Sequence, residues 1–150
     1  MNARNILTQI ATLSFIGYLP VAPGTWGSVA GLLFVALTRV PSPALAAIVA
    51  AGTVLGVIAA DAAEKEIGET DSGHIIIDEF VGYLVSVVFV PHTFVYLLAA
   101  FLLFRFFDIL KPFPIGMVEK KLSGGWGVMA DDIAAGLIVN MVLQIWKMTF

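Results

Sequence analysis

The chain has 150 residues, a formal net charge of -3 and no cysteine, and 59% of its residues are hydrophobic while only 13% are charged. This length suits one domain, and so high an apolar content predicts a membrane protein rather than a soluble globular one. The lack of cysteine excludes disulfides, thiolate nucleophiles and Cys-based metal sites, and the scattered basic residues with a negative net charge argue against nucleic acid as a partner.

The N-terminal segment, residues 1–16, carries Arg4 as its only charge. No small-residue cleavage site follows its apolar stretch, so the pattern does not match a removable signal peptide. We therefore expect a retained helix that lies at the membrane interface.

Charge-free intervals divide the rest of the chain into candidate membrane helices. The Pro41-Ser42-Pro43 stretch breaks the first of them, because proline removes a backbone donor and disfavours helix in the residue before it. We expect helices over about 28–40 and 43–62, and a last helix over about 130–148. Several of these are shorter than the roughly 20 residues that a straight crossing needs.

The charge-free interval 80–104 is long enough for one crossing but contains Pro91, His92 and Thr93 near its middle. Proline with polar neighbours is unfavourable in one lipid-facing helix, which favours a hairpin that turns there. Glu79 and Arg105 each lie thirteen residues from His92, so a hairpin brings them to the same depth, whereas a single crossing puts them on opposite sides.

These turns predict an all-α, compact membrane bundle of about five spans plus the interfacial helix, as one domain over residues 1–150. Most of the charge then collects on one side of the membrane. That side is predicted to be cytoplasmic, because cytoplasmic loops carry an excess of Lys and Arg; its basic residues are Lys65, Arg105, Lys111, Lys120 and Lys121.

Two pairs of adjacent acids open apolar helices on the predicted cytoplasmic side: Asp78 with Glu79, and Asp131 with Asp132 after a glycine-rich loop. Clustered carboxylates repel one another unless a cation neutralises them, and their oxygens suit a hard ion such as Mg²⁺. The alternative is that the acids only favour the helix dipole. Asp61, at the end of the second span, is a further acid of interest.

The segment 105–111 places Arg105, Asp108 and Lys111 at intervals of three residues, so all three can face one partner. The alternative is a helix end whose basic side chains reach the headgroups while Asp108 pairs with Arg105. An acid at the membrane boundary is costly without a cation or metal to receive it. The cations themselves suit a phosphate group.

The stretch "YLPVAPGTWGS" combines two prolines, two glycines and two hydroxyls just before a helix. Such a loop can expose backbone N–H groups to an anion, with Thr25 and Ser28 as further donors. An ordinary turn with either hydroxyl as the helix N-cap fits the pattern as well. Together with the acids and cations, this loop favours metal-assisted phosphoryl chemistry at a cytoplasmic membrane surface.

Four segments resemble the phosphatidylglycerophosphatase A family in order and spacing: "GYLPVAPGTWGS", "DSGHIIIDEFVG", "FRFFDILKPFPI" and "GGWGVMADDIAAG". The resemblance covers roughly residues 17–136. It implies an all-helical, Mg²⁺-dependent phosphatase of the bacterial inner membrane that hydrolyses phosphatidylglycerophosphate to phosphatidylglycerol and phosphate. One departure is that Ala60 stands before Asp61, where family members often have a cysteine, so this chain has no cysteine nucleophile.

The resemblance and the residue types together define the expected site. A metal-activated water is the expected nucleophile, with a carboxylate as general base, and an aspartyl-phosphate intermediate stays open. The expected catalytic residues are Asp78, Glu79, Asp108, Asp131 and Asp132, and the expected metal ligands are Asp61, Asp78, Glu79, Asp131 and Asp132. The expected substrate-binding residues are Gly24, Thr25, Gly27, Ser28, Arg105 and Lys111.

Two other classes of function fit the sequence less well than a phosphatase does. An ion or proton transporter usually needs polar groups near the bilayer midplane, and here the span centres carry no charge. A non-catalytic protein that binds anionic lipid needs the basic boundary residues but not the acid pairs, which would repel such lipids unless a metal were bound. A CDP-alcohol phosphotransferase would need a long spaced acid motif that this sequence lacks.

Overall fold

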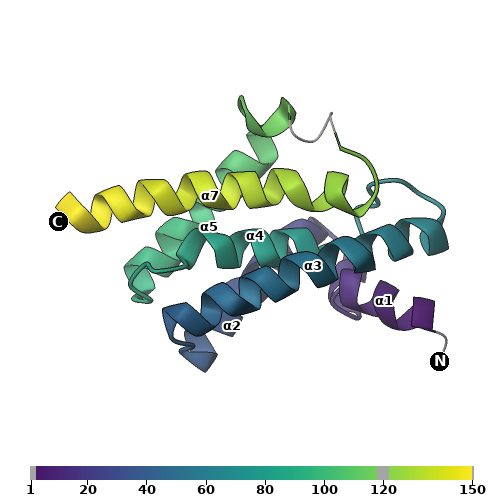
Figure 1. Ribbon diagram of the computed structural model, residues 1–150, viewed down its shortest axis with the longest axis horizontal. Coiled ribbons are helices and arrows are strands. Elements are labelled where there is room, and N and C mark those ends of the chain that lie inside the picture. The colour runs from purple at the N-terminus through teal and green to yellow at the C-terminus, as the bar shows by residue number, and fades with distance from the viewer. Residues whose placement is uncertain (1–2, 118–121, 150) are drawn as a thin grey trace.

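The computed structural model describes residues 3–117 and 122–149, and these contain helices and turns but no strand. Lys120 and Lys121, two of the basic residues on the predicted cytoplasmic side, lie outside the described residues. Figure 1 shows the helices packed side by side as a bundle. The elements are α1 (Ala3–Ala11), η1 (Ile16–Tyr18), α2 (Pro23–Thr38), α3 (Ser42–Ile67), α4 (Ile77–Val87), α5 (Phe94–Leu110) and α7 (Gly125–Thr149).

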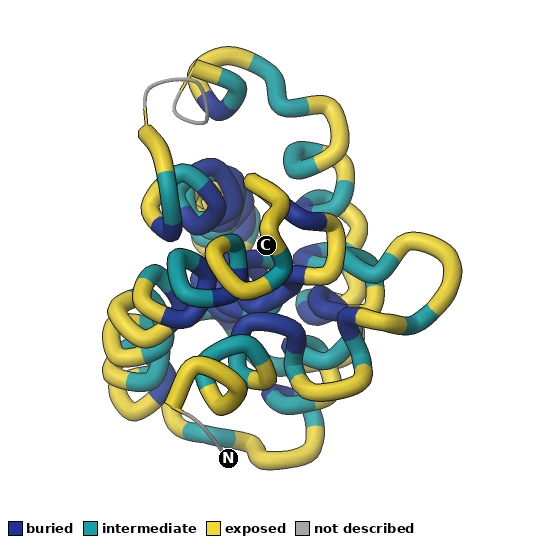
Figure 2. The backbone as a smooth tube through the Cα atoms, turned by 90° about the vertical axis from the view of Figure 1, so that its right-hand side faces the viewer, coloured by how far each residue is buried: buried dark blue, intermediate teal, exposed yellow. Residues whose placement is uncertain are grey.

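Helix α4 forms the centre of the bundle. Nearly all of its residues are buried, and it packs against α2, α3, α5 and α7. Figure 2 shows the same distribution, with buried backbone in the middle of the molecule and exposed backbone around it. Beyond Asp78 and Glu79 in its first turn, α4 carries no charged residue, which is typical of a helix in the core of a bundle or inside a membrane.

Three helix ends differ from the sequence prediction. Helix α2 begins at Pro23 rather than near 28, because proline suits the first turn of a helix. Helix α3 continues to Ile67, and the residue that caps it, Gly68, has a left-handed conformation that favours glycine. Helix α7 begins at Gly125 rather than near 130, so part of the expected glycine loop is helical.

The predicted hairpin at residues 91–93 is confirmed. Helix α4 ends at Val87 and α5 begins at Phe94, so the chain reverses between them. The Asn140 amide of α7 donates hydrogen bonds to the carbonyl oxygens of Val85 and Val88, at 3.1 and 2.8 Å. These bonds tie α7 to the C-terminal end of α4, where the Val85 carbonyl oxygen also accepts from the Val88 N–H at 3.4 Å.

Helices α3 and α7 are each long and apolar enough to cross a membrane, and α2 is a shorter apolar helix. All three run roughly alongside α4 in Figure 1. Many large apolar side chains on the outside of the bundle are exposed, among them Leu37, Phe94 and Met148. Exposed apolar surface of this extent suits contact with lipid.

Candidate metal and phosphate site

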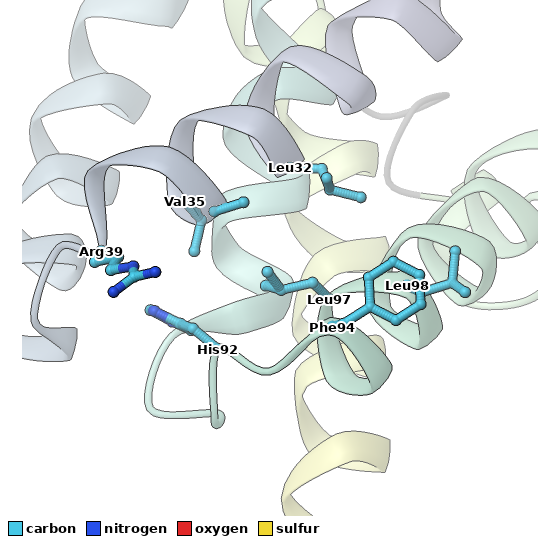
Figure 3. A pocket seen from close by; sticks show the side chains of 8 residues that line it. Leu32, Val35, Arg39, His92, Phe94, Leu97 and Leu98 are labelled. Atoms are coloured by element: carbon cyan, nitrogen blue, oxygen red, sulfur yellow. The ribbon is translucent and has the colours of Figure 1, made fainter.

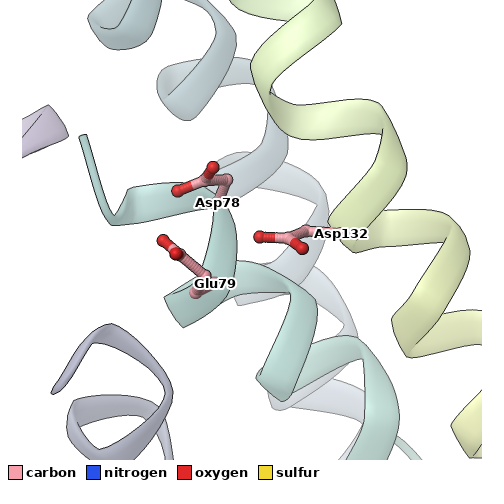
Figure 4. Close-up of side chains that lie close together, drawn as sticks. All are labelled: Asp78, Glu79 and Asp132. Atoms are coloured by element: carbon pink, nitrogen blue, oxygen red, sulfur yellow. The ribbon is translucent and has the colours of Figure 1, made fainter. Parts of the chain in front are cut away.

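Three carboxylates converge where the first turn of α4 meets α7. Ligand oxygens of Asp78, Glu79 and Asp132 all lie within 4.8 Å of one another. Figure 4 shows the three side chains directed toward a common point, two from α4 and one from α7. We call these three residues the acidic cluster.

A close approach of α4 and α7 builds the acidic cluster. A Cβ atom at Gly82 would lie 2.8 Å from the backbone oxygen of Asp132, and one at Gly136 would collide with the backbone oxygen of Gly82. Only glycine therefore lets the two helices pack at this distance. Sequence analysis did not assign Gly82 and Gly136 this positioning role, although small residues inside apolar membrane helices are a known signal of close helix packing.

The acidic cluster is buried and short of hydrogen-bond donors. Asp78 is 8% and Asp132 is 2% exposed. Within the part of the chain that the structure describes, Asp78 Oδ1, Glu79 Oε2 and Asp132 Oδ1 are buried and have no hydrogen-bond partner. Buried carboxylates without donors or cations are strongly unfavourable.

A divalent cation fits this arrangement. Three carboxylates from two helices supply hard oxygen ligands of the kind that Mg²⁺, Ca²⁺ and Mn²⁺ prefer. Their unpartnered oxygens are those that such a cation would satisfy. The donor set thus matches hard divalent cations as a class.

Arg105 lies beside the acidic cluster, as the hairpin predicts. Its Nη1 atom is 4.0 Å from Glu79 Oε1 on the opposite arm of the hairpin. The same atom donates to the Asp108 carboxylate one helical turn away and lies 3.5 Å from Ser28 Oγ. Glu79 on α4 and Asp108 on α5 therefore hold the guanidinium near the cluster, and the pair with Asp108 is the local ion pair that the sequence suggested.

The second acid pair divides between two roles. Asp131 is buried, and its Oδ2 atom lies 2.7 Å from Lys111 Nζ, whereas Asp132 belongs to the acidic cluster. Adjacent helical residues point about 100° apart, which explains why the two carboxylates separate. Lys111, just after the end of α5, is thereby tied to α7 close to the cluster.

The start of α2 lies against the same site. A Cβ atom at Gly24 would collide with Glu79 Oε1 and lie 3.4 Å from Arg105 Nη1, and one at Gly27 would lie 2.7 Å from the backbone oxygen of Ile76. Gly24, Thr25, Gly27 and Ser28 are helical, in place of the expected loop. Ser28 Oγ donates to the Gly24 carbonyl oxygen at 3.1 Å. Glycine at position 24 thus lets the α2 backbone approach the Glu79 carboxylate and Arg105 closely.

Two of the expected metal ligands are not part of the acidic cluster. Asp61 lies on α3, pairs with Lys65 and keeps 45% of its side-chain surface exposed. Asp131 pairs with Lys111 as described above. Asp61 instead faces solvent and the start of α7, where Gly124 lies close to it. A metal-binding role of Asp61 and Asp131 therefore stays a prediction from the sequence, while Asp78, Glu79 and Asp132 are the expected ligands that lie together.

The amino-acid sequence is similar to one known protein family. The family model described as Phosphatidylglycerophosphatase A matches residues 9–147. A Haemophilus influenzae protein named phosphatidylglycerophosphatase A is 37% identical over 163 residues, which cover 99% of this chain and 100% of that protein. An Escherichia coli protein of the same name is 36% identical over 129 residues, 85% of this chain and 75% of the relative.

A third relative carries a different name. A Bacteroides thetaiotaomicron protein, provisionally named as a phosphatidylinositol-3-phosphatase, is 40% identical over 138 residues, 86% of each chain. No solved structure matches the chain. All three names describe removal of a phosphate group from a membrane lipid.

Proposed function

The chain belongs to the phosphatidylglycerophosphatase A family, and we propose that it is a membrane phosphatase that converts phosphatidylglycerophosphate into phosphatidylglycerol and phosphate. The observation that carries the proposal is the acidic cluster with Arg105 beside it. Carboxylates that hold a cation next to a guanidinium that binds phosphate are the parts that hydrolysis of a phosphate monoester needs.

We further propose how this single domain lies in the membrane. Helices α2, α3, α4, α5 and α7 are the five spans, and α1 lies at the interface. The ends that carry the acidic cluster face the cytoplasm of a bacterial inner membrane, in agreement with the basic residues on that side. This orientation presents the site to lipid headgroups of the inner leaflet.

For the metal, we propose that Asp78, Glu79 and Asp132 hold Mg²⁺. Their unpartnered buried oxygens support this assignment. When bound, the cation would neutralise the carboxylates, polarise the phosphoryl group and activate a water molecule. A non-catalytic lipid-binding role does not explain three buried acids, because they would repel anionic lipids.

Arg105 is the proposed phosphate-binding group. Its guanidinium can donate to phosphoryl oxygens and offset the negative charge that develops on them during transfer. Asp108 holds the Arg105 side chain in place from the same helix, and Gly24 lets the start of α2 pack closely against Glu79 and Arg105. Lys111, held by Asp131, supplies a second positive charge nearby.

We propose water as the attacking group. The water oxygen bonds to phosphorus, the bond from phosphorus to the glycerol oxygen breaks, a carboxylate of the cluster accepts a proton from the water, and the glycerol oxygen takes up a proton. This route predicts that acid-quenched reactions contain no phosphorylated protein. A labelled phosphoryl group on an aspartate would instead assign the covalent route.

The substrate assignment is tested with the purified chain in detergent micelles. Phosphate release is measured from phosphatidylglycerophosphate, phosphatidic acid, phosphatidylinositol 3-phosphate and glycerol 3-phosphate, each with Mg²⁺ or with excess chelator. We expect the fastest release from phosphatidylglycerophosphate and none in chelator. Preference for another of these substrates would replace the assigned substrate, and full activity in chelator would overturn the metal.

A further inference from the structure

Between α2 and α5 lies an apolar groove of about 460 Å³, lined by Leu32, Val35, Ala36, Arg39, His92, Phe94, Leu97 and Leu98. Resting on the proposed function, we infer that this groove binds one acyl chain of the lipid phosphate substrate. The groove thereby determines that the enzyme acts on lipids rather than on soluble phosphate esters. Figure 3 shows Leu32, Val35 and Leu97 between the two helices, with Arg39 and His92 together at one end.

The register of the two helices connects this groove to the phosphate site. Ser28 and Arg105 lie 3.5 Å apart at the acidic end of α2 and α5. Arg39 and Phe94 both line the groove: Phe94 lies eleven residues from Arg105 along α5, and Arg39, the residue that follows α2, lies eleven residues after Ser28. Eleven residues return an α-helix to within about 20° of the same face. The groove and the phosphate-binding groups thus share one seam between two antiparallel helices.

The dimensions of the seam suit a bound lipid. Along α2 the groove runs from Leu32 to Arg39, seven residues or roughly 10 Å, which suits a segment of a fatty acyl chain. Leu98 lies seven residues from Arg105, or about 10 Å along α5. This interval accommodates the glycerol headgroup between the terminal phosphate at Arg105 and an acyl chain in the groove.

The chemistry of the lining suits a hydrocarbon chain. Leu32, Val35, Ala36, Leu97 and Leu98 form its walls, and none of the described residues that line the groove is acidic. Its volume lies within the roughly 300–1,000 Å³ that is typical of small-ligand pockets. In a membrane, apolar walls hold an acyl chain by close van der Waals packing, because the surrounding lipid tails are as apolar as the walls, and such packing does not select a headgroup.

A lipid of the opposite leaflet, with its headgroup at Arg39, is the competing occupant. His92 does not add to such a site, because its Nε2 atom lies 3.1 Å from the Val87 carbonyl oxygen and hydrogen-bonds the backbone. Among the described residues that line the groove, Arg39 then offers the only charge, whereas the other end offers Arg105 and Lys111 beside the proposed metal site. The observations favour a lipid held by its phosphate at the acidic end.

The test fills the groove and varies the substrate chain. Ala36→Phe inserts a ring between α2 and α5, and Ala47→Phe makes the same change on the exposed side of α3. Both variants are assayed with phosphatidylglycerophosphate that carries two palmitoyl or two hexanoyl chains. We expect Ala36→Phe to lower kcat/KM for the long-chain lipid at least about tenfold and to change the short-chain value less than about twofold. Ala47→Phe should change neither.

A second measurement does not depend on catalysis or on one variant folding. A long-chain phosphatidylglycerophosphate analogue with a photoreactive group near the acyl terminus is crosslinked to the wild-type chain, and the labelled peptides are identified. We expect label on the α2 and α5 residues of the groove and its loss when unlabelled long-chain substrate competes.

Each outcome decides between the alternatives. Equal losses on both substrates in Ala36→Phe, or unchanged kcat/KM on both, would overturn the groove assignment while leaving the phosphatase function intact. Label that phosphatidylglycerol of the opposite leaflet displaces, and substrate does not, would assign the groove to that lipid. If the wild-type chain hydrolyses neither lipid, the proposed function itself fails.

Discussion

Two acidic regions of this protein have similar compositions but different surroundings. At the end of α3, Asp61 pairs with Lys65, Glu66 accepts a hydrogen bond from Thr8, and Glu64 accepts one from the Asp71 backbone. In the acidic cluster, Asp78 and Asp132 are buried, and one oxygen of each has no partner in the described ranges 3–117 and 122–149. The difference shows that partners and burial, not the number of acids, mark the candidate metal site.

The cause lies in how the helices pack. The last turns of α3 face solvent, where water and nearby donors satisfy carboxylates at little cost. The first turn of α4 is enclosed by α2, α5 and α7, so its acids lose water, and although Arg105 lies 4.0 Å from Glu79, one buried oxygen each of Asp78 and Glu79 gains no hydrogen-bond partner among the described residues. A folded chain retains such an arrangement where a ligand compensates for it, and a divalent cation is the ligand that matches the oxygens.

The largest expected effect comes from removing a charge of the acidic cluster. Asp132→Asn keeps the shape of the side chain but removes an anionic ligand, so we expect kcat/KM for phosphatidylglycerophosphate to fall by about a thousandfold. Phosphate release with saturating Mg²⁺ measures the change, and circular dichroism checks that the helices remain. A variant with near wild-type activity would show that Asp132 holds no catalytic metal.

A smaller loss is expected when the neighbouring cation is removed. Arg105→Ala leaves the acidic cluster intact but takes away the proposed phosphate ligand, so kcat/KM should fall by about a hundredfold. Lys65→Ala, which removes the cation of the other acidic region, is the matched control and should retain activity within about twofold. Equal losses in both variants would favour a general attraction of the surface for anionic lipid over a specific phosphate site.

The smallest effect is expected at Asp61. Its ion pair with Lys65 is 45% and 65% exposed on the two side chains, and exposed pairs contribute roughly 0–1 kcal/mol to the free energy of unfolding. Asp61→Asn should therefore leave both activity and thermal stability near their wild-type values. If Asp61→Asn abolished activity as Asp132→Asn does, the contrast between the two acidic regions would be lost, and Asp61 would have a catalytic role.

The sequence predicted the main topology because strong local signals specify it. Pro91 and its polar neighbours interrupt an apolar run, and the equal distances of Glu79 and Arg105 from His92 predicted their meeting, which the 4.0 Å separation confirms. Charge-free intervals likewise predicted the all-helical class. Five spans and the cytoplasmic orientation stay predictions, since two helices alone are long and apolar enough by themselves in the described part of the chain.

The sequence indicated all three residues of the acidic cluster as metal ligands, but it could not show that they lie together without Asp61 and Asp131. Asp131 and Asp132 are adjacent and chemically equal, and only the rotation of α7 against α4 and Lys111 decides which of them joins Asp78. Asp61 was expected to be a ligand because it follows an apolar run, yet α3 continues past it to Ile67 and leaves its side chain exposed. Such choices depend on packing between distant segments.

The most direct test of the account is equilibrium binding of Mn²⁺, which resembles Mg²⁺ in its preference for oxygen ligands and is visible by electron paramagnetic resonance. We predict saturable Mn²⁺ binding to the wild-type chain and to Asp61→Asn, competition by Mg²⁺, and loss of this binding in Asp132→Asn. Unchanged Mn²⁺ binding in Asp132→Asn, or its loss in Asp61→Asn alone, would contradict the assignment of the acidic cluster as the metal site.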